Sequence, residues 1–567
     1  MLRISHNRSA HRARRSLLRT AAVAAAVALV GSGAGLAALP AAAASTPFLS
    51  SFETADPQPL ASTPYGTQTN VSGKVPPGSL SAYIGNVTAS AENAPGETAV
   101  KLTDNNSNTK WLAKAATGWV VYTFAKPTLV TDYALTSGND SAGRDPKDFT
   151  IEGSNDGTVW SPVDAQTGQT FSNRQATNEY HLATPVTFSQ YRFTVTQNSG
   201  DAYLQLADWD LRDATPGATP MLSVVGAGPT NGYNAKAGAG FSGTHALRYG
   251  GKHIADGAAA ATNLLYDGVG ATIGTKTELS YKVFPDRGTD LAVPSSWVAV
   301  DLVLDDGTTL SSKQNLTDAN GFGVTARAHG EQKSLFENEW NNIQIDLSSL
   351  AGRTVQKVLL SYDYPTGSAS TVFSGWIDDV RIGDAAPAAD ASSKVKLVDT
   401  RRGTLSSSSF SRGTNIPATA WPNGFNFFTP FTNGGSQGTL YEYQRANNAD
   451  NLPTLQAIGI SHEPSIWMGD RDQLGIMPST SGTPNGDLTT RALAFSHSDE
   501  IARPDLYSVK FQNNLVTEVT PTDHGGIFRF QFPGTTGSVI VDRVGGTSSL
   551  SVAADGTVSG WTDGGSG

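Results

Sequence analysis

Apolar and polar residues alternate in short runs along most of the chain beyond residue 46. Clear examples are WVVYTF at 119–124 and WVAVDLVL at 297–304. A period of two places successive side chains on opposite faces of a strand. Turn sequences such as NDG at 155–157 and DDG at 305–307 separate such runs. Because no segment keeps an amphipathic helical period for three turns, the pattern predicts a mainly β protein.

Two linkers poor in large apolar residues interrupt this pattern. They are DATPGATP at 213–220 and GDAAPAADASS at 383–393. A chain of 567 residues is too long for one hydrophobic core. We therefore expect three consecutive β-sandwich or jelly-roll domains after a leader. The expected divisions are a leader at 1–44, an N-terminal strand and connector at 46–81, a first block at 82–212, a second block at 221–382, a linker at 383–394 and a third block at 395–567.

The leader has the three parts of an export signal. Residues 1–19 are basic, residues 20–39 are almost wholly apolar, and Ala42, Ala43 and Ala44 offer small side chains to a signal peptidase. The apolar run is rich in alanine and broken by glycines, so we expect cleavage rather than retention as an anchor. RRSLLR at 14–19 resembles the twin-arginine signal, the alternative being a general secretory signal. Either predicts a secreted, extracellular protein without a membrane span.

Composition and charge exclude several classes of site and partner. The sequence contains no cysteine, so disulfides, thiolate nucleophiles and cysteine-bound zinc are excluded. The formal net charge is −10, and the chain becomes more acidic once the arginine-rich leader is removed. Because an acidic surface without a basic block repels phosphate backbones, we expect no nucleic-acid partner.

Three ordered motifs characterise the first block. They are LTDNNSNTKW at 102–111, DPKDFTIEGSNDGTVW at 145–160 and LADWDL at 206–211. The block resembles the factor V/VIII type C, or discoidin, domain, whose β-sandwich is shared by family 32 carbohydrate-binding modules. The resemblance implies sugar binding. Arg144, Asn139 and Tyr203 are candidate contacts for the sugar, or else serve packing and the surface.

The first of these motifs is a tight loop rich in oxygen donors, which suits a hard cation such as Ca²⁺. The resemblance implies a structural calcium bound by six residues: Lys101 and Ala207 through their carbonyls, with Asp104, Asn106, Thr109 and Asp208. Asn106 stands where relatives often have a carboxylate, and Asp208 where they often have glutamate, which would weaken binding. The alternative is that Asp104 and Asn106 only form a turn with their own backbone.

The second block closes with WIDDVRI at 376–382 and resembles jelly-roll accessory modules of carbohydrate enzymes. Asp378 and Asp379 are candidate calcium or sugar ligands, or solvated acids at a strand end. PFLSSFE at 47–53 reads as an opening strand of such a jelly-roll, although it precedes the first block. We therefore predict that the first block is inserted after this strand.

The third block carries the most specific strings. They are PNGFNFFTP at 422–430, ISHEPSIWMGDR at 460–471 and FSHSDE at 495–500. Their order resembles the N-terminal β-sandwich of glycoside hydrolase family 92, calcium-dependent exo-acting α-mannosidases that invert the anomeric centre. The resemblance implies a secreted glycosidase that acts on mannose-containing glycans.

One stretch of this block combines an imidazole, carboxylates, a guanidinium and an indole, which together suit a sugar pocket. We expect five residues to bind substrate: His462, Glu463, Trp467, Asp470 and Arg471. The alternative is that His462 and Glu463 brace a loop while Trp467 fills the core.

The catalytic acid and base cannot be named in this sequence. The resemblance places both, with the catalytic calcium, on a following (α/α)6 domain that we expect beyond Gly567. We therefore expect this chain alone to bind glycans without hydrolysing them. The alternative is a non-catalytic carbohydrate-binding or adhesion protein.

Overall fold

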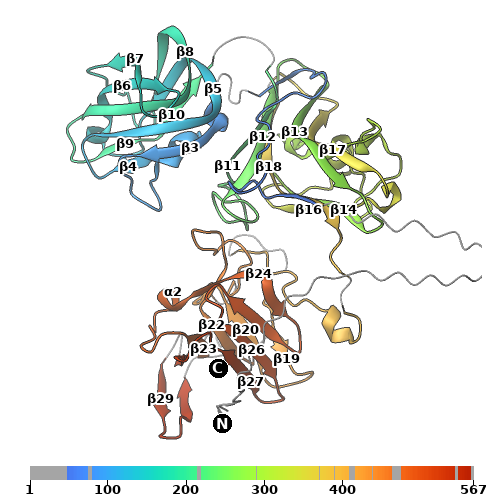
Figure 1. The fold of residues 1–567 in the computed structure, drawn as a ribbon. Coiled ribbons are helices and arrows are strands. Elements are labelled where there is room, and N and C mark those ends of the chain that lie inside the picture. Colours follow the sequence, from blue (N-terminus) through green and yellow to red (C-terminus); the bar gives the residue numbers. More distant parts are fainter. Residues whose placement is uncertain are drawn as a thin grey trace, which may run out of the picture.

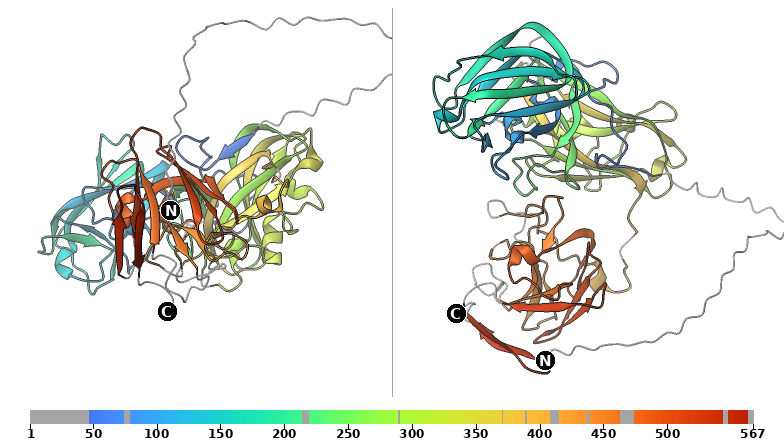
Figure 2. Two further views of the ribbon diagram at one scale, coloured as in Figure 1. Left: turned by 90° about the horizontal axis from the view of Figure 1, so that it is seen from below. Right: turned by 60° about the vertical axis from the view of Figure 1, so that its left-hand side comes forward.

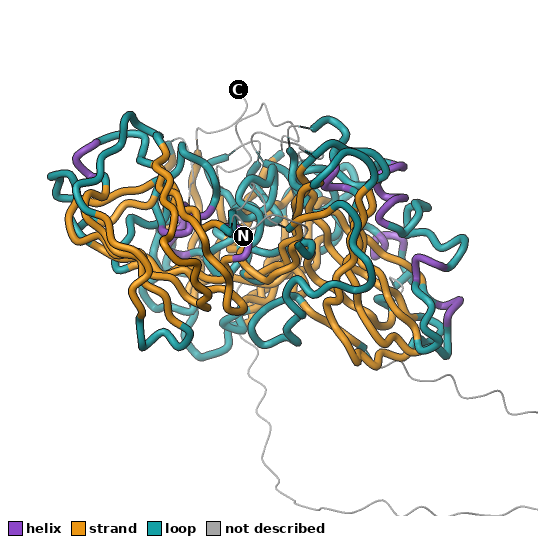
Figure 3. Tube along the Cα trace, turned by 90° about the horizontal axis from the view of Figure 1, so that it is seen from above, coloured by secondary structure: helices purple, strands orange, loops and turns teal. Residues whose placement is uncertain are grey.

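The computed structural model describes ten stretches of the chain: residues 47–73, 79–213, 219–288, 290–369, 371–387, 390–407, 415–436, 439–462, 474–542 and 547–562. Strands dominate them (Figure 3). Two α-helices occur in these stretches, α1 (Ala326–Gln332) and α2 (Leu488–Arg491). The prediction of a mainly β protein is thus confirmed, whereas the leader predicted at 1–44 lies outside the described residues.

The first block is a β-sandwich around an aromatic core (Figure 1). The alternation predicted in β5 is observed, because Val120, Tyr122 and Phe124 are buried while Val121 and Thr123 are only partly buried. The main sheet has the order β10-β5-β8-β6-β7 with β3 on β5, and β4 pairs with β9. Its strands are β3 (Ile84–Ala89), β4 (Trp111–Ala113), β5 (Gly118–Thr136), β6 (Pro146–Ser154), β7 (Ser161–Gln166), β8 (Thr177–Asn198), β9 (Leu204–Leu206) and β10 (Asp208–Arg212).

The second block packs a seven-stranded sheet on a three-stranded one. The larger has the order β11-β12-β18-β14-β16, joined by β1 and β2, and the smaller β13-β17-β15. Between them lies the most extensive core, which includes Leu279, Leu302 and Ile377. Its strands are β1 (Phe48–Ser50), β2 (Val71–Ser72), β11 (Leu222–Ala227), β12 (His245–His253), β13 (Ala259–Thr272), β14 (Thr277–Pro285), β15 (Val298–Leu304), β16 (Asn341–Asp346), β17 (Thr354–Tyr364) and β18 (Val372–Asp384).

The first two strands of the chain, β1 and β2, belong to the second block although they precede the first block in the sequence. Strand β1 pairs antiparallel with β18, with Phe48 opposite Ile382. Strand β2 pairs with β12, with Val71 opposite His253. The strand read from the sequence at 47–53 therefore lies in the sheet of the second block, and the first block is inserted between β2 and β11.

The third block is again a sandwich of two sheets, with Phe428, Met477 and Val509 in its core. The sheets have the orders β19-β20-β22-β23-β28 and β21-β24-β25-β26-β27, and β29 and β30 form a separate hairpin. Its strands are β19 (Thr419–Ala420), β20 (Phe427–Phe431), β21 (Thr454–Leu455), β22 (Ala457–Ser461), β23 (Leu474–Ser479), β24 (Leu493–Ala502), β25 (Tyr507–Phe511), β26 (Val516–Pro521), β27 (Gly526–Gln531), β28 (Ser538–Asp542), β29 (Ser548–Val552) and β30 (Val558–Thr562).

The second block contacts both of the others, and Figure 2 shows how the three blocks are arranged. Tyr83 of the first block packs against Leu222 and Val224 of β11. On the other side, Asn451 of the third block donates hydrogen bonds to the carbonyls of Gly240 (2.9 Å) and Gly243 (2.7 Å). The second block is therefore the hub of the molecule.

Within the described stretches, no helix is long and apolar enough to cross a bilayer.

Candidate functional site

The oxygen-rich loop of the first block lies between the short helix η2 (Ala99–Thr103) and β4. The Asp104 carboxylate accepts hydrogen bonds from the Thr109 hydroxyl at 2.9 and 2.8 Å and from the Asn106 backbone N–H at 3.0 Å. The Lys101 ammonium lies 3.7 Å from the same carboxylate. The loop therefore forms the turn that the alternative interpretation predicted. It also contains four of the six predicted calcium ligands, Lys101, Asp104, Asn106 and Thr109.

A buried tyrosine fixes this loop against the strand that supplies the other ligands. The Tyr122 hydroxyl donates to the carbonyls of Leu102 (3.1 Å) and Trp209 (3.0 Å). Its ring stacks on Trp209, with 4.2 Å between ring centroids. Tyr122 therefore holds η2 and the start of β10 together, and places Asp104 and Asp208 at one end of the sandwich.

Asp208 is the unusual member of this group. It is only 8% exposed, and its Oδ1 atom has no hydrogen-bond partner among the described residues. Burial and the charges of Asp104 and Asp210 raise the pKa of Asp208 to about 7. An unpaired buried carboxylate oxygen is costly and normally finds a partner.

The residues present therefore fit a calcium ion, because a hard cation would satisfy Oδ1 of Asp208 beside the oxygens of the loop. The fit depends on carbonyl, amide and hydroxyl donors as well as carboxylates. In the described stretches, no group of three or more histidine, aspartate and glutamate side chains is arranged to hold a metal.

The candidate sugar contacts of the first block lie close together. The Arg144 guanidinium lies 5.4 Å from the centroid of the Tyr203 ring, and Tyr203 is 39% exposed. The Asn139 side-chain oxygen accepts from the Lys110 ammonium at 3.2 Å, and that ammonium also pairs with Asp140 at 2.7 Å. An exposed ring flanked by charged and amide groups can stack on a pyranose and bind its hydroxyls.

In the third block, the structure describes one of the five predicted substrate ligands. His462 follows β22, and its ring is stacked parallel to Phe425, with 5.4 Å between centroids. Phe425 is also stacked with His524 at 5.6 Å, and it is 59% exposed beside Trp421, which is 55% exposed. The other four predicted ligands, Glu463, Trp467, Asp470 and Arg471, lie outside the described residues.

Sequence reasoning did not single out Phe425 and His524. Phe425 lies in the PNGFNFFTP string at 422–430, which was used only as one of the strings that carry the family resemblance. The glycine and asparagine before Phe425 are a turn signal that could have indicated an exposed aromatic.

The FSHSDE string supplies a buried carboxylate with many partners. Glu500 accepts hydrogen bonds from the hydroxyls of Tyr441 (3.0 and 2.9 Å) and Tyr507 (2.9 Å). His497 Nδ1 lies 2.8 Å away and the Arg401 guanidinium 3.2 Å away. Burial acts to raise the pKa of Glu500, but these donors outweigh it and lower the pKa below its ordinary value. Such a saturated group acts as a structural brace.

Asp378 and Asp379 are also structural, and Asp378 is wholly buried rather than solvated. Asp378 accepts the backbone N–H groups of Phe241 (2.6 Å) and Ser242 (3.2 Å). Asp379 accepts the Ser242 hydroxyl. These acids therefore shape the loop whose carbonyls bind Asn451 of the third block.

Comparisons with known proteins agree with both resemblances. Residues 397–566 match the family model of the glycosyl hydrolase family 92 N-terminal domain, and residues 86–208 match the F5/8 type C domain. The chain therefore carries both domains, as the sequence predicted.

A curated relative is a peptide-N(4)-(N-acetyl-beta-glucosaminyl)asparagine amidase from Arabidopsis thaliana, 36% identical over 136 residues. That match covers 22% of this chain and 19% of the relative, so this chain spans about a fifth of the relative's length.

Solved structures with similarity include a family GH92 inverting mannosidase from Bacteroides thetaiotaomicron. It is 34% identical, with a TM-score of 0.27, over 30% of this chain and 22% of that chain. Another is the family 32 carbohydrate-binding module of Clostridium perfringens NanJ in complex with galactose. It is 17% identical, with a TM-score of 0.22, over 24% of this chain and 98% of that chain.

Proposed function

We propose that this chain is the glycan-binding front part of a secreted, calcium-dependent, inverting exo-α-mannosidase that acts on mannose-containing glycans. The observation that carries the proposal is the match of residues 397–566 to the family 92 N-terminal domain. The F5/8 type C domain at residues 86–208 supports an accessory role in glycan binding. Secretion would follow from the leader at 1–44.

The substrate pocket is proposed to include an aromatic surface on the third block, formed by Trp421, Phe425, His462 and His524. Exposed aromatic rings stack on the apolar faces of sugars, and imidazole nitrogens bind sugar hydroxyls. Glu463, Trp467, Asp470 and Arg471 follow His462 within nine residues of the chain and remain proposed as further substrate ligands.

We propose that the chain alone binds glycans without hydrolysing them. Inversion needs a protonated carboxylic acid and a carboxylate base about 6.5–9.5 Å apart, with room for a water molecule. Glu500 does not suit either role, because tyrosine, histidine and arginine side chains already occupy its oxygens. The acid, the base and the catalytic calcium are proposed to belong to an (α/α)6 domain beyond Gly567.

In the first block, we propose that a structural calcium is held by Lys101, Asp104, Asn106, Thr109, Ala207 and Asp208. The orphaned Oδ1 of Asp208 supports this site. Arg144, Asn139 and Tyr203 are proposed as contacts for the accessory sugar, whose identity the site does not specify.

Binding and turnover are tested separately on the same protein. The full chain should bind α-mannobiose saturably in calorimetry and should not release 4-nitrophenol from its α-mannoside in the presence of calcium. Phe425→Ala should weaken mannobiose binding by up to about tenfold, because a stacked aromatic contact is worth about 0.5–1.5 kcal/mol beyond the area that it buries. Phe322→Ala, which removes an exposed phenylalanine of the second block, should leave binding unchanged.

Each opposite result counts against a specific claim. Release of 4-nitrophenol by the chain would refute the proposal that it lacks the acid and the base. Unchanged mannobiose binding by Phe425→Ala would refute the proposed pocket. The reading frame beyond Gly567 decides between enzyme and adhesion protein. Several hundred further residues of paired helices support the mannosidase, and a stop codon directly after Gly567 supports the non-catalytic alternative.

A further inference from the structure

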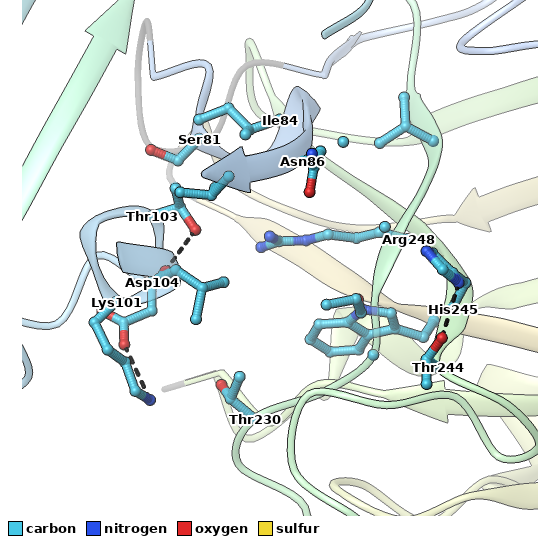
Figure 4. A pocket seen from close by; sticks show the side chains of 18 of the residues that line it. Ser81, Ile84, Asn86, Lys101, Thr103, Asp104, Thr230, Thr244, His245 and Arg248 are labelled. Atoms are coloured by element: carbon cyan, nitrogen blue, oxygen red, sulfur yellow. Dashed lines mark hydrogen bonds and ion pairs between the residues drawn. The ribbon is translucent and has the colours of Figure 1, made fainter. Parts of the chain in front are cut away.

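A cleft of about 440 Å³ opens between the first and second blocks. It shares no lining residue with either glycan site proposed above, but Lys101, Asp104 and Asn106 of the calcium loop lie along it. One wall comes from β3 and η2 of the first block, and the other from β11 and β12 of the second. Cavities of about 300–1,000 Å³ are typical of small-molecule sites, and these often lie between domains. Figure 4 shows the side chains that line it.

Arg248 extends from β12 into this cleft, toward Asn86 and Thr103 on the opposite wall (Figure 4). Its guanidinium lies 5.4 Å from the centroid of the Trp376 ring. Its Nε atom is buried, and no hydrogen bond or ion pair joins its side chain to any residue in the described part of the chain. Burial lowers the pKa of Arg248, a sign that its charge is poorly solvated.

Asp286 is the acidic group whose charge acts to raise the pKa of Arg248, but no ion pair joins the two side chains among the described residues. Asp286 accepts hydrogen bonds from the Asn231 amide (2.8 Å) and the Ser374 hydroxyl (3.0 Å). Asp104 pairs with Lys101 on the rim. A partly buried cation without an ion partner is costly, and an anionic ligand would remove that cost.

The rest of the lining suits a ring that carries hydroxyl groups. Asn86 and Thr230 offer an amide and a hydroxyl group from opposite walls. Because the carboxylate of Asp286 also faces the cleft, a doubly charged phosphate would meet more repulsion than a singly charged carboxylate. The lining thus favours one carboxylate on a polyhydroxylated ligand.

We propose that this cleft is a separate binding site for an acidic glycan, in which Arg248 binds the carboxylate of a uronic acid unit. Hydroxyl groups of the sugar bind Asn86 and Thr230. The site stands independently of the mannosidase proposal, since none of its residues belongs to the mannose surface of the third block.

The test compares two disaccharides that differ only in the acid group. Cellobiouronic acid and cellobiose are titrated into the full chain by calorimetry at low ionic strength. The acid should bind saturably and about tenfold or more tightly than cellobiose, because a charge-assisted hydrogen bond is worth about 1.5–3 kcal/mol. Added salt should weaken the binding of the acid.

Variants locate the site. Arg248→Gln should weaken binding of the acid about tenfold or more, whereas Arg248→Lys should retain part of the affinity. Arg192→Gln is the matched control. Arg192 also stacks on an indole, 4.3 Å from the Trp160 ring, but lies outside the cleft, so this variant should bind normally. Melting temperatures show that each variant is folded.

The proposal is overturned if the acid does not bind, if the two disaccharides bind equally, or if Arg248→Gln and Arg192→Gln behave alike. A short peptide with a C-terminal glutamate is titrated as well. Tighter binding of this peptide than of cellobiouronic acid would show that the cleft recognises acidic peptides instead.

Discussion

Two buried carboxylates, Asp208 in the first block and Glu500 in the third, are 8% and 4% exposed yet differ in their surroundings. The Glu500 oxygens accept from two tyrosine hydroxyls and lie beside His497 and Arg401. The Asp208 Oδ1 has no partner in the described part of the chain. The pKa of Glu500 is accordingly lowered, whereas that of Asp208 is raised to about 7.

The difference separates a brace from a binding site. A carboxylate whose lone pairs are all occupied stabilises the fold and has nothing left to offer a ligand. A carboxylate with one oxygen buried without a partner destabilises the fold until a cation or another ligand binds that oxygen. Exposure alone does not distinguish the two, and the count of hydrogen-bond donors does.

The largest expected effect is the loss of the Glu500 charge. Glu500→Gln should lower the free energy of unfolding of the third block by about 3–5 kcal/mol, because Arg401 and His497 would lose a buried partner. Urea denaturation measures this loss. Asp505→Asn, which removes a surface ion pair with Arg503 at 3.2 Å, should cost less than about 1 kcal/mol. Equal losses of unfolding free energy in the two variants would show that Glu500 contributes no more than a surface ion pair.

Acid should remove the same stabilisation gradually. The folded pKa of Glu500 lies below its ordinary value of 4.5, so its ionised form stabilises the third block above that value. This contribution should disappear as the pH falls from about 4.5 through the lowered folded pKa. Urea unfolding from neutral to acidic pH tests this, and the same series with Glu500→Gln should depend less on pH. A variant with an unchanged pH dependence would contradict the assignment.

Calcium should stabilise the first block, whereas acid should destabilise the third. At a hundredfold excess over its Kd, calcium should raise the free energy of unfolding by about 2.7 kcal/mol. Asp208→Asn should abolish this gain and, without calcium, should itself stabilise the block by about 1–3 kcal/mol by removing the unpaired charge. Thermal unfolding with calcium or chelator measures both. Asp148→Asn, elsewhere in the block, should keep the calcium response, and a response that persists in Asp208→Asn would exclude the site.

The smallest expected effect concerns the tyrosine that joins the two halves of the calcium site. Tyr122→Phe removes hydrogen bonds to Leu102 and Trp209 and should cost about 1–3 kcal/mol while also weakening calcium binding. Tyr191→Phe is a matched control, because its hydroxyl also donates to two carbonyls, those of Thr128 (2.8 Å) and Val186 (3.1 Å). It should cost a similar amount with no change in calcium affinity. Equal calcium affinities in the two variants would refute the positioning role.

Local pattern was enough to predict the strands and the oxygen-rich loop around Asp104, whereas Asp208 was predicted only through the resemblance to discoidin domains. The alternation at 119–124 predicted which side chains of β5 are buried, and the spacing of oxygen donors in LTDNNSNTKW indicated the loop around Asp104. Both signals lie within about ten consecutive residues.

The Glu500 brace and the Arg248 cleft were not predicted, since their parts are far apart in the sequence. Arg401 and Tyr441 lie 99 and 59 residues before Glu500 and outside the named strands, so only the folded chain brings them to it. Tyr507 lies on β25, which pairs with β24. Asp378 and Asp379 were considered as possible solvated acids for the same reason. The loop at 240–243 that buries them lies more than a hundred residues earlier.

The insertion of the first block has a consequence for how the protein is made and cut. Because the chain passes between the two blocks twice, after β2 and before β11, a single proteolytic cut in either crossing leaves the first block attached. The backbone of β1 can pair only after β18 has been synthesised, more than three hundred residues later. The first block can fold while the second is still incomplete, and closure of the second block's sheet is then a late step in synthesis.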